Sequence, residues 1–231
     1  MRINRFYLEN FSGQKNIELE NNSTFHQIKN VLKMRLGDQL SFFCNFREAI
    51  YRISFIDNKK IIFDFVKNIP IKKNNRKIFL FSSLIKKDKL EWVVQKAVEL
   101  GVSGIIPVIS ERSEKKKINL DRLNKISLEA SEQCGRQDII KVSEVVKLEE
   151  ALRKLDGLSF LGDSSGVDFK TEFKLCQLGE KINIFIGPEG GWTKEELEMA
   201  KKNKARVVCL NGNILRSETA VVAFLSLAFN L

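Results

Sequence analysis

The sequence predicts an α/β protein in which a small β-rich domain precedes a larger domain with a parallel sheet. Residues 1–68 contain short runs rich in Phe and Ile that are broken by Asn, Asp and Gly, a pattern typical of β-strands. After residue 77 strand-like and helix-like segments alternate, which indicates a parallel α/β sheet. Between these regions, IPIKKNNRK (69–77) combines a Pro, an Asn pair and four basic residues, as linkers often do. We therefore expect domains over residues 1–70 and 71–231.

The first domain is predicted to be a compact, barrel-like sheet with one short helix. The helix is expected over STFHQIKNVLKMRLG, where Ser23 or Thr24 would cap its start and Gly37 would follow its end. The expected strands are RFYLEN, QLSFFCN, EAIYRISFIDN and KIIFDFVKN.

The second domain is predicted to join its strands through amphipathic helices. The expected strands are KIFLFSSLI, GIIPVI, LSFLG, KINIFIG and VVCL. The expected helices are KLEWVVQKAVELG, NLDRLNKISLEASEQCG, KLEEALRKLDG, TKEELEMAKKN and the apolar run after Ser217, which is the expected cap of that last helix.

The charge balance favours a polyanionic partner. The 231 residues include 39 Lys and Arg against 29 Asp and Glu, a formal net charge of +10 at pH 7. Lys and Arg release counterions when they meet phosphates, so such an excess is typical of nucleic-acid-binding proteins. A genome that favours Lys codons would raise the charge without any partner.

The composition argues against a metal site and a membrane span. Four cysteines are scattered without a C-x-x-C pair or a nearby His, so we expect no metal and a reducing compartment. The N-terminus lacks the apolar region of a signal peptide. The longest apolar run, TAVVAFLSLAFNL, is too short to span a bilayer. We expect a soluble, cytoplasmic protein with no membrane partner.

A glycine-rich loop follows one expected strand in the stretch IFIGPEGGWTKEEL. Thr193 and Glu196 have the spacing of a capping box, and Trp192 and Leu197 occupy the two staple positions around it. A helix that begins at 193–194 would offer unpaired N–H groups to a ligand. The loop matches neither G-x-x-x-x-G-K-[ST] nor G-x-G-x-x-G, so we do not expect either common phosphate-binding motif. A tight turn that needs only glycine freedom is the structural alternative.

A second loop of the same kind follows in RVVCLNGNILRSETAVVAFLSLAF. Two strand–loop–helix units in succession predict parallel strands with both loops at their carboxyl ends, where α/β sheets bind ligands. We therefore expect a pocket formed by residues 186–191 and 210–220. Backbone groups together with Leu210, Ile214 and Leu215 would suit an uncharged base and ribose better than a triphosphate.

The two loops together resemble the paired signatures of the ribosomal small subunit methyltransferase E family. That family belongs to the SPOUT superfamily of S-adenosylmethionine-dependent RNA methyltransferases. The resemblance rests on IGPEGGWTKEEL and LNGNILRSETA, and HQIKNVLKMRLGD, VQKAVELGVSGIIPVISERS and EASEQCGRQDI agree with it. It spans nearly the whole chain.

The resemblance implies a PUA-like RNA-binding barrel followed by a SPOUT domain with a trefoil knot. It also implies a homodimer with the active site near the interface, S-adenosyl-L-methionine as cofactor, and methylation of N3 of a uridine in 16S rRNA of the small ribosomal subunit. Two positions depart from the family pattern. Lys33 stands where Arg is usual, and Ile139–Ile140 replace a region that commonly contains Pro.

The resemblance assigns the pocket residues to the cofactor. Gly187, Gly190 and Gly191 would let the backbone approach it, and Pro188 would stiffen the turn. The alternative for the apolar members is simple packing in the core or the sheet. The expected cofactor-binding residues are Leu161, Gly162, Ile186, Gly187, Pro188, Glu189, Gly190, Gly191, Leu210, Asn211, Ile214, Leu215, Thr219 and Ala220.

The expected catalytic residues are Arg216, Arg136 and Glu218. Methylation at N3 requires loss of the N3 proton, so the protein has to orient the reactants and manage that proton. Either Arg could hold a phosphate or an enolate-like uracil oxygen, or it could form a structural ion pair. Glu218 could serve only the N-terminus of its helix. No residue is singled out as the general base, and the single His, His26, is expected to be structural or to contact RNA.

Expected RNA contacts are Arg5, Lys33, Arg35 and Arg112, of which Arg112 is also a third candidate for the catalytic Arg. The runs SERSEKKK and IKKNNRK could follow the RNA or form solvated faces. Two other functions remain possible from the sequence. One is a related methyltransferase that acts on tRNA or a ribose 2′-oxygen, and the other is an RNA-binding assembly factor without activity.

Overall fold

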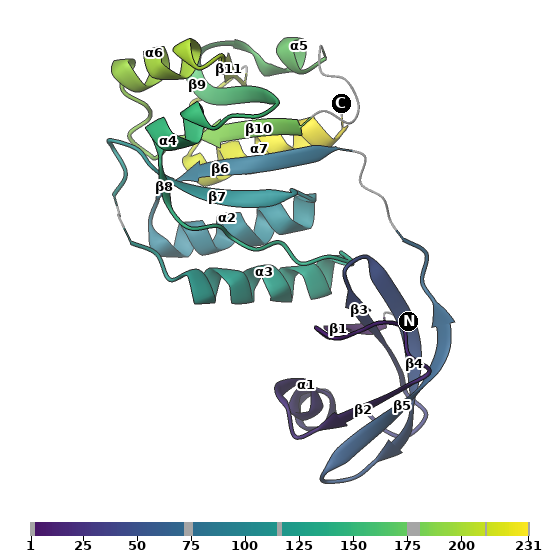
Figure 1. The fold of residues 1–231 in the computed structure, drawn as a ribbon. Coiled ribbons are helices and arrows are strands. Elements are labelled where there is room, and N and C mark those ends of the chain that lie inside the picture. The colour runs from purple at the N-terminus through teal and green to yellow at the C-terminus, as the bar shows by residue number, and fades with distance from the viewer. Residues whose placement is uncertain (1–2, 72–75, 115–116, 175–180, 211, 231) are drawn as a thin grey trace. The chain divides into compact units, whose positions relative to one another are not determined.

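The computed structural model describes residues 3–71, 76–114, 117–174, 181–210 and 212–230 (Figure 1). The chain divides into two compact units. The N-terminal unit comprises Met1–Lys73 and Ser131–Ile139, and the C-terminal unit comprises Asn74–Ala130 and Ile140–Leu231. None of the helices in these described ranges is long and apolar enough to cross a membrane.

The N-terminal unit contains a curled, mixed sheet of five strands in the order β1-β3-β4-β5-β2. The strands are β1 (Asn4–Tyr7), β2 (Asn16–Glu20), β3 (Gln39–Cys44), β4 (Arg47–Ile56) and β5 (Lys60–Asn68). β1 runs parallel to β3, and the other neighbours are antiparallel. The register between β4 and β5 shifts twice, and such bulges bend a sheet. Four of these strands confirm the sequence prediction, whereas β2 was not predicted.

The helix of this unit is shorter than predicted. It consists of α1 (Ser23–His26) and one π-helical turn, η1 (Gln27–Val31). The Asn22 side chain accepts a hydrogen bond from the Phe25 N–H, so the predicted caps Ser23 and Thr24 were wrong. The helix does not reach Gly37, because Lys33 has a left-handed backbone with φ of 51°.

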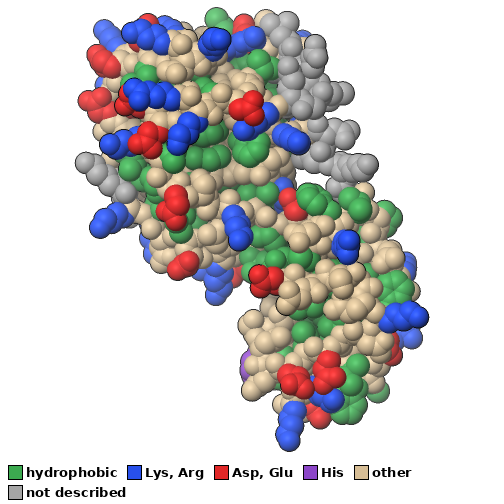
Figure 2. Space-filling model, in the orientation of Figure 1, with side chains coloured by type: hydrophobic (Ala, Val, Ile, Leu, Met, Phe, Trp, Pro, Cys, Tyr) green, Lys and Arg blue, Asp and Glu red, His purple; other side chains and the backbone are tan. Residues whose placement is uncertain are grey.

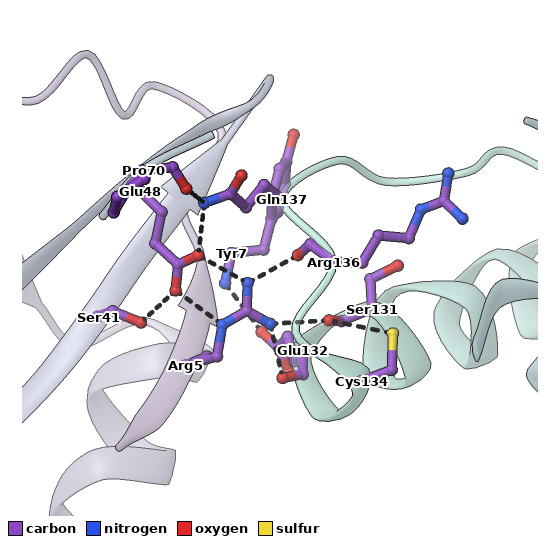
Figure 3. Close-up of polar contacts among 10 residues, drawn as sticks. All are labelled: Arg5, Tyr7, Ser41, Glu48, Pro70, Ser131, Glu132, Cys134, Arg136 and Gln137. Carbon is purple, nitrogen blue, oxygen red and sulfur yellow. Dashed lines mark hydrogen bonds and ion pairs between the residues drawn. The ribbon is translucent and has the colours of Figure 1, made fainter. Parts of the chain in front are cut away.

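Arg5 on β1 is the centre of a polar network within the N-terminal unit (Figure 3). Its Nε and Nη2 donate to the two carboxylate oxygens of Glu48 at 2.7 and 3.1 Å. Its Nη1 donates to the carbonyls of Ser131 and Glu132 at 3.0 Å, and Nη2 also donates to that of Arg136 at 2.7 Å. A guanidinium has five N–H donors, so these contacts use all of them.

Glu48 is the buried acceptor of this network, with a side chain only 4% exposed. It also accepts from the Ser41 hydroxyl at 2.8 Å and from the Gln137 amide at 3.2 Å. Burial raises the pKa of Glu48, but the hydrogen bonds from Arg5, Ser41 and Gln137 outweigh burial and hold it below its ordinary value of 4.5. The network therefore attaches residues 131–139, distant in sequence, to the strands of the same unit.

The C-terminal unit contains an all-parallel sheet of six strands in the order β11-β9-β10-β6-β7-β8. The strands are β6 (Lys77–Ser83), β7 (Gly104–Ile109), β8 (Val146–Lys147), β9 (Leu158–Asp168), β10 (Lys181–Ile186) and β11 (Arg206–Cys209). The helices are α2 (Lys87–Leu100), α3 (Leu120–Cys134), α4 (Leu148–Arg153), α5 (Phe169–Phe173), α6 (Lys194–Lys202) and α7 (Ser217–Asn230). The last turn of α3 is grouped with the N-terminal unit.

Helices cover both faces of this sheet (Figure 1). One core contains side chains of α2, α3, α5 and α7, and the other contains side chains of α4 and α6. β10 serves both cores, because Ile184 points into the first and Phe185 into the second, as alternation along a strand requires. The predicted strands and helices of this domain are confirmed, although β9 is longer than LSFLG, and β8 and α5 were not predicted.

We expect Glu48→Gln to destabilise the N-terminal unit by about 3 kcal/mol, because it leaves a largely buried Arg5 without its counter-charge. Hydrogen exchange of residues 39–68 in the full chain measures this. Glu18→Gln is the matched control, since the Glu18–Lys60 pair is exposed and its loss should have little effect on stability.

The Glu48 effect should also depend on pH. A carboxyl whose folded pKa is depressed stabilises the protein above its unfolded pKa, and this stabilisation is lost as pH falls through the folded pKa. The difference between wild type and Glu48→Gln should therefore shrink below pH 4.5. Equal effects of the Glu48 and Glu18 variants at neutral pH would contradict the network's structural role.

Candidate active site

A pocket of about 460 Å³ opens at the carboxyl ends of β10 and β11, beside the middle of β9. Its walls come from three segments: residues 162–164 of β9, residues 186–192 around the end of β10, and residues from the end of β11 into α7. The ladder between β11 and β9 shifts its register after Val207, so β9 residues 162–166 leave that ladder beside the pocket. This is the edge at which parallel α/β sheets bind ligands.

Trp192 fixes the glycine-rich loop to the neighbouring strand. Its buried indole donates from Nε1 to the Gly162 carbonyl at 3.0 Å. The indole also packs against Gly187, where an added Cβ would lie 3.0 Å from Trp192 Cε2. Gly191 closes the turn in a left-handed conformation with φ of 69°, and its N–H donates to the Pro188 carbonyl at 2.9 Å. The loop is therefore held by specific contacts on both sides.

The predicted capping box at the start of α6 is confirmed. The Thr193 hydroxyl accepts from the Glu196 N–H, and a Glu196 carboxylate oxygen accepts from the Thr193 N–H. The other Glu196 oxygen accepts from the Glu111 N–H at 2.9 Å. The next residue, Arg112, donates from Nη1 to the Gly190 carbonyl at 2.7 Å. A second loop thus supports the glycine-rich loop from outside the pocket wall.

The loop before α7 is tied directly to the glycine-rich loop. The buried hydroxyl of Ser217 donates to the Gly187 carbonyl at 2.6 Å. The prediction that Ser217 caps α7 was therefore wrong, since Ser217 is the first helical residue and its hydroxyl is used across the pocket. Ile214, next to this tie, is 91% exposed while it lines the pocket.

Most of the predicted cofactor-binding residues line one pocket. Leu161 does not, because it is fully buried in the core beneath the sheet, and Thr219 is not among the lining residues. Asn211 lies outside the described residues. The predicted residues in the lining are Gly162, Ile186, Gly187, Pro188, Glu189, Gly190, Gly191, Leu210, Ile214, Leu215 and Ala220.

Sequence reasoning missed five lining residues that lie outside the predicted segments 186–191 and 210–220: Asp163, Ser164, Trp192, Cys209 and Phe224. Trp192 was noticed only as a helix-start signal. Asp163 and Ser164 lie in the second half of β9, beyond the predicted strand LSFLG, which ends at Gly162.

Charged groups near the pocket differ in their surroundings. Arg216 precedes α7 with an exposed side chain that forms no hydrogen bond or ion pair with the described residues. Glu218, in the first turn of α7, is only 17% exposed and lies 3.5 Å from Lys89 Nζ. Arg136 belongs to the N-terminal unit, where its guanidinium forms a bidentate pair with Asp138. It does not line the pocket of the C-terminal unit.

Comparison with known proteins agrees with this architecture. Residues 72–229 match the model of an RNA methyltransferase domain. A ribosomal RNA small subunit methyltransferase E from Buchnera aphidicola (subsp. Schizaphis graminum) is 32% identical over 96% of this chain and 94% of its own. The chain belongs to the ribosomal RNA small subunit methyltransferase E family.

Other members of this family align with this chain over a similar share of its length. The Rickettsia conorii enzyme is 27% identical over 96% of this chain and 93% of its own. A crystal structure of the Neisseria gonorrhoeae enzyme, bound to S-adenosyl methionine, superimposes with a TM-score of 0.86 at 28% identity, and covers 97% of this chain and 96% of that one. The chain is therefore an rRNA methyltransferase, as the resemblance implied.

The family's expected RNA contacts have different positions in the two units. Lys33 and Arg35 are exposed on the N-terminal unit, whereas every guanidinium donor of Arg5 is already used within it. An RNA contact by Arg5 stays a prediction that would require giving up one of these bonds. Arg112 is exposed but holds Gly190. On the face drawn in Figure 2, basic side chains lie interspersed with acidic ones.

We expect Trp192→Phe to destabilise the C-terminal unit by about 1–3 kcal/mol, because the Gly162 carbonyl loses its donor in a buried position. Urea unfolding followed by circular dichroism measures the change. Trp92→Phe is the control: Trp92 is 42% exposed on α2, and its replacement should stay within about 0.5 kcal/mol. Equal effects of the two changes would show that the bond to Gly162 is unimportant.

Proposed function

We propose that this protein methylates N3 of a specific uridine in 16S rRNA, with S-adenosyl-L-methionine bound in the pocket between the two loops. The observation that supports the cofactor site most strongly is the nature of the lining. Ile186, Leu210 and Phe224 offer apolar surface for a base, and the glycine-rich backbone offers donors and acceptors at close range. Asp163 adds a carboxylate to the same lining. These residues fit an adenosyl group.

When bound, the sulfonium of the cofactor supplies a methyl group that is already electrophilic. The task of this chain is then to bind the uridine in line with that methyl group and to stabilise the charge that develops on the base. As the bond from N3 to the methyl carbon forms and the carbon–sulfur bond breaks, the N3 proton has to leave for a base or for water.

Arg216 is the residue we propose for the uracil oxygen or a flanking phosphate. It lies between the pocket residues Leu215 and Ser217, and its guanidinium has no partner among the described residues. All its donors are therefore available to a ligand. For Arg136 the same role would require exchange of its pair with Asp138, so we place it second.

The N-terminal unit is proposed to bind the rRNA, with Lys33 and Arg35 as phosphate contacts on its exposed segment. We further propose a homodimer, for which exposed Ile214 at the pocket and Val167 on the same unit provide apolar surface. A reaction on ribosomal RNA would take place in the cytoplasm, where the small ribosomal subunit is made.

Nucleoside mass spectrometry of 16S rRNA tests the proposed reaction. A strain without this protein should lack 3-methyluridine, and expression of the protein should restore it. Unchanged 3-methyluridine in the deletion strain would refute the proposal. Loss of a 2′-O-methyl nucleoside, or of a methylated tRNA nucleoside, would instead assign the related activities.

Arg216→Ala should reduce the rate of methylation by about 100-fold or more, because a donor that meets developing charge in the transition state is lost. The fold should be unaffected, since the side chain has no partner within the described protein. Arg153→Ala, which removes another exposed Arg, from α4, is the control and should leave the rate unchanged. Methylation at the wild-type rate by the Arg216 variant would remove this residue from the mechanism.

A further inference from the structure

Lys89 links the two loops that form the pocket. It is the third residue of α2, and its Nζ lies 3.1 Å from Glu189 Oε1 and 3.5 Å from Glu218 Oε1. Glu189 belongs to the glycine-rich loop, and Glu218 belongs to the first turn of α7, directly after the second loop. One ammonium from a third element therefore meets a carboxylate from each side of the pocket.

The position of this lysine is not explained by the stability of its own helix. A positive charge in the first turn of a helix is opposed by the helix dipole, which favours acidic residues there. Other lysines of α2 pair within the helix, as Lys96 does with Glu99. Lys89 instead pairs with residues 100 and more positions away in sequence. Its contacts thus serve the pocket loops.

The two carboxylates depend on Lys89 for compensation. Glu218 is largely buried, and its Oε2 is out of contact with solvent and has no hydrogen-bond partner in the described part of the protein. The hydrogen bond to Glu189, more than the charge of Glu218, raises the pKa of Lys89, so the ammonium stays charged at neutral pH. Without the Lys89 ammonium, the negative charges of Glu189 and Glu218 would face each other across the ends of the two loops.

Lys89 acts next to a second tie between the same loops. The Ser217 hydroxyl already binds the Gly187 carbonyl, but this bond joins the loops at one point only. The bridge from Glu189 through Lys89 to Glu218 connects the two loops at a second place. Two connections fix the distance between the pocket walls, whereas one connection only keeps the loops in contact. We propose that Lys89 is a positioning residue that holds the two walls at the spacing required for S-adenosyl-L-methionine; this inference rests on the proposed function.

Replacement of Lys89 should affect cofactor binding more than the chemical step. We expect Lys89→Met to raise the Kd for S-adenosyl-L-methionine by about tenfold or more, the size of effect typical of coupled neighbouring groups. In methylation assays the KM for the cofactor should rise while kcat at saturating cofactor stays nearly unchanged, because the interaction that is lost serves ground-state binding. Lys89→Arg keeps the charge and should restore most of the affinity.

Isothermal titration calorimetry with S-adenosyl-L-methionine on the full chain is the test. Lys96→Met is the matched control, because it removes an ammonium of similar exposure from the same helix, 30% against 24%, whose partner does not line the pocket. In a Glu189→Gln background the effect of Lys89→Met should shrink, since part of the bridge is already missing. If Lys89→Met does not fold, Lys89→Gln gives the same comparison.

The outcomes separate this inference from the function on which it rests. If the wild-type protein does not bind S-adenosyl-L-methionine, the proposed function fails. If wild type binds and Lys89→Met or Lys89→Gln binds with the same Kd, the positioning role fails while the function stands. Equal losses in the Lys89 and Lys96 variants, or an effect that is undiminished beside Glu189→Gln, would also overturn the positioning role.

Discussion

The parallel alignment of β9, β10 and β11 is the constraint on which the rest of the C-terminal unit depends. It brings segments from three parts of the chain to one edge of the sheet. The packing on both faces of the sheet holds these strands in register, because neighbouring residues of a strand point into different cores. The loops that carry the pocket residues therefore begin and end at strands and helices that the core holds in place.

Given that edge, the shape of the pocket is set by a few polar ties between loops. Trp192 joins the glycine-rich loop to β9, and Ser217 joins it to α7. Arg112 and Lys89 hold the same loop from two further elements. Each tie alone contributes little, but together they leave the backbone little freedom before a ligand arrives. A site that is recognised through backbone groups requires such preorganisation.

The N-terminal unit uses buried charge for a comparable purpose. Arg5 and Glu48 are paired and fully hydrogen-bonded, and the pair includes the carbonyls of residues 131, 132 and 136. Buried pairs of this kind add little net stability compared with apolar residues, yet the loss of one partner is costly. The effect of the Arg5–Glu48 pair is to specify that residues 131–139 pack against the strands of the N-terminal unit. Arg136 contributes to this through its backbone, so its guanidinium remains paired with the partly buried Asp138 of the same segment.

The sequence allowed prediction of most of what depends on local pattern, and the misses at the polar contacts share one physical cause. Strand alternation, helix periodicity and the Thr193–Glu196 cap are short-range signals that were confirmed for most elements, although β2, β8 and α5 were missed. The polar contacts that define both units are long-range: Lys89 and Glu189 are 100 residues apart, and Arg5 and Arg136 are 131 apart. A single Lys or Arg has the same local signature whether it faces solvent or joins two loops. For that reason the sequence did not reveal that Arg5 joins two segments of the N-terminal unit, and Lys89 was not singled out. The same argument explains the cap at Ser217, because a serine before an apolar run predicts a helix start but not whether its hydroxyl is needed by a carbonyl 30 residues away.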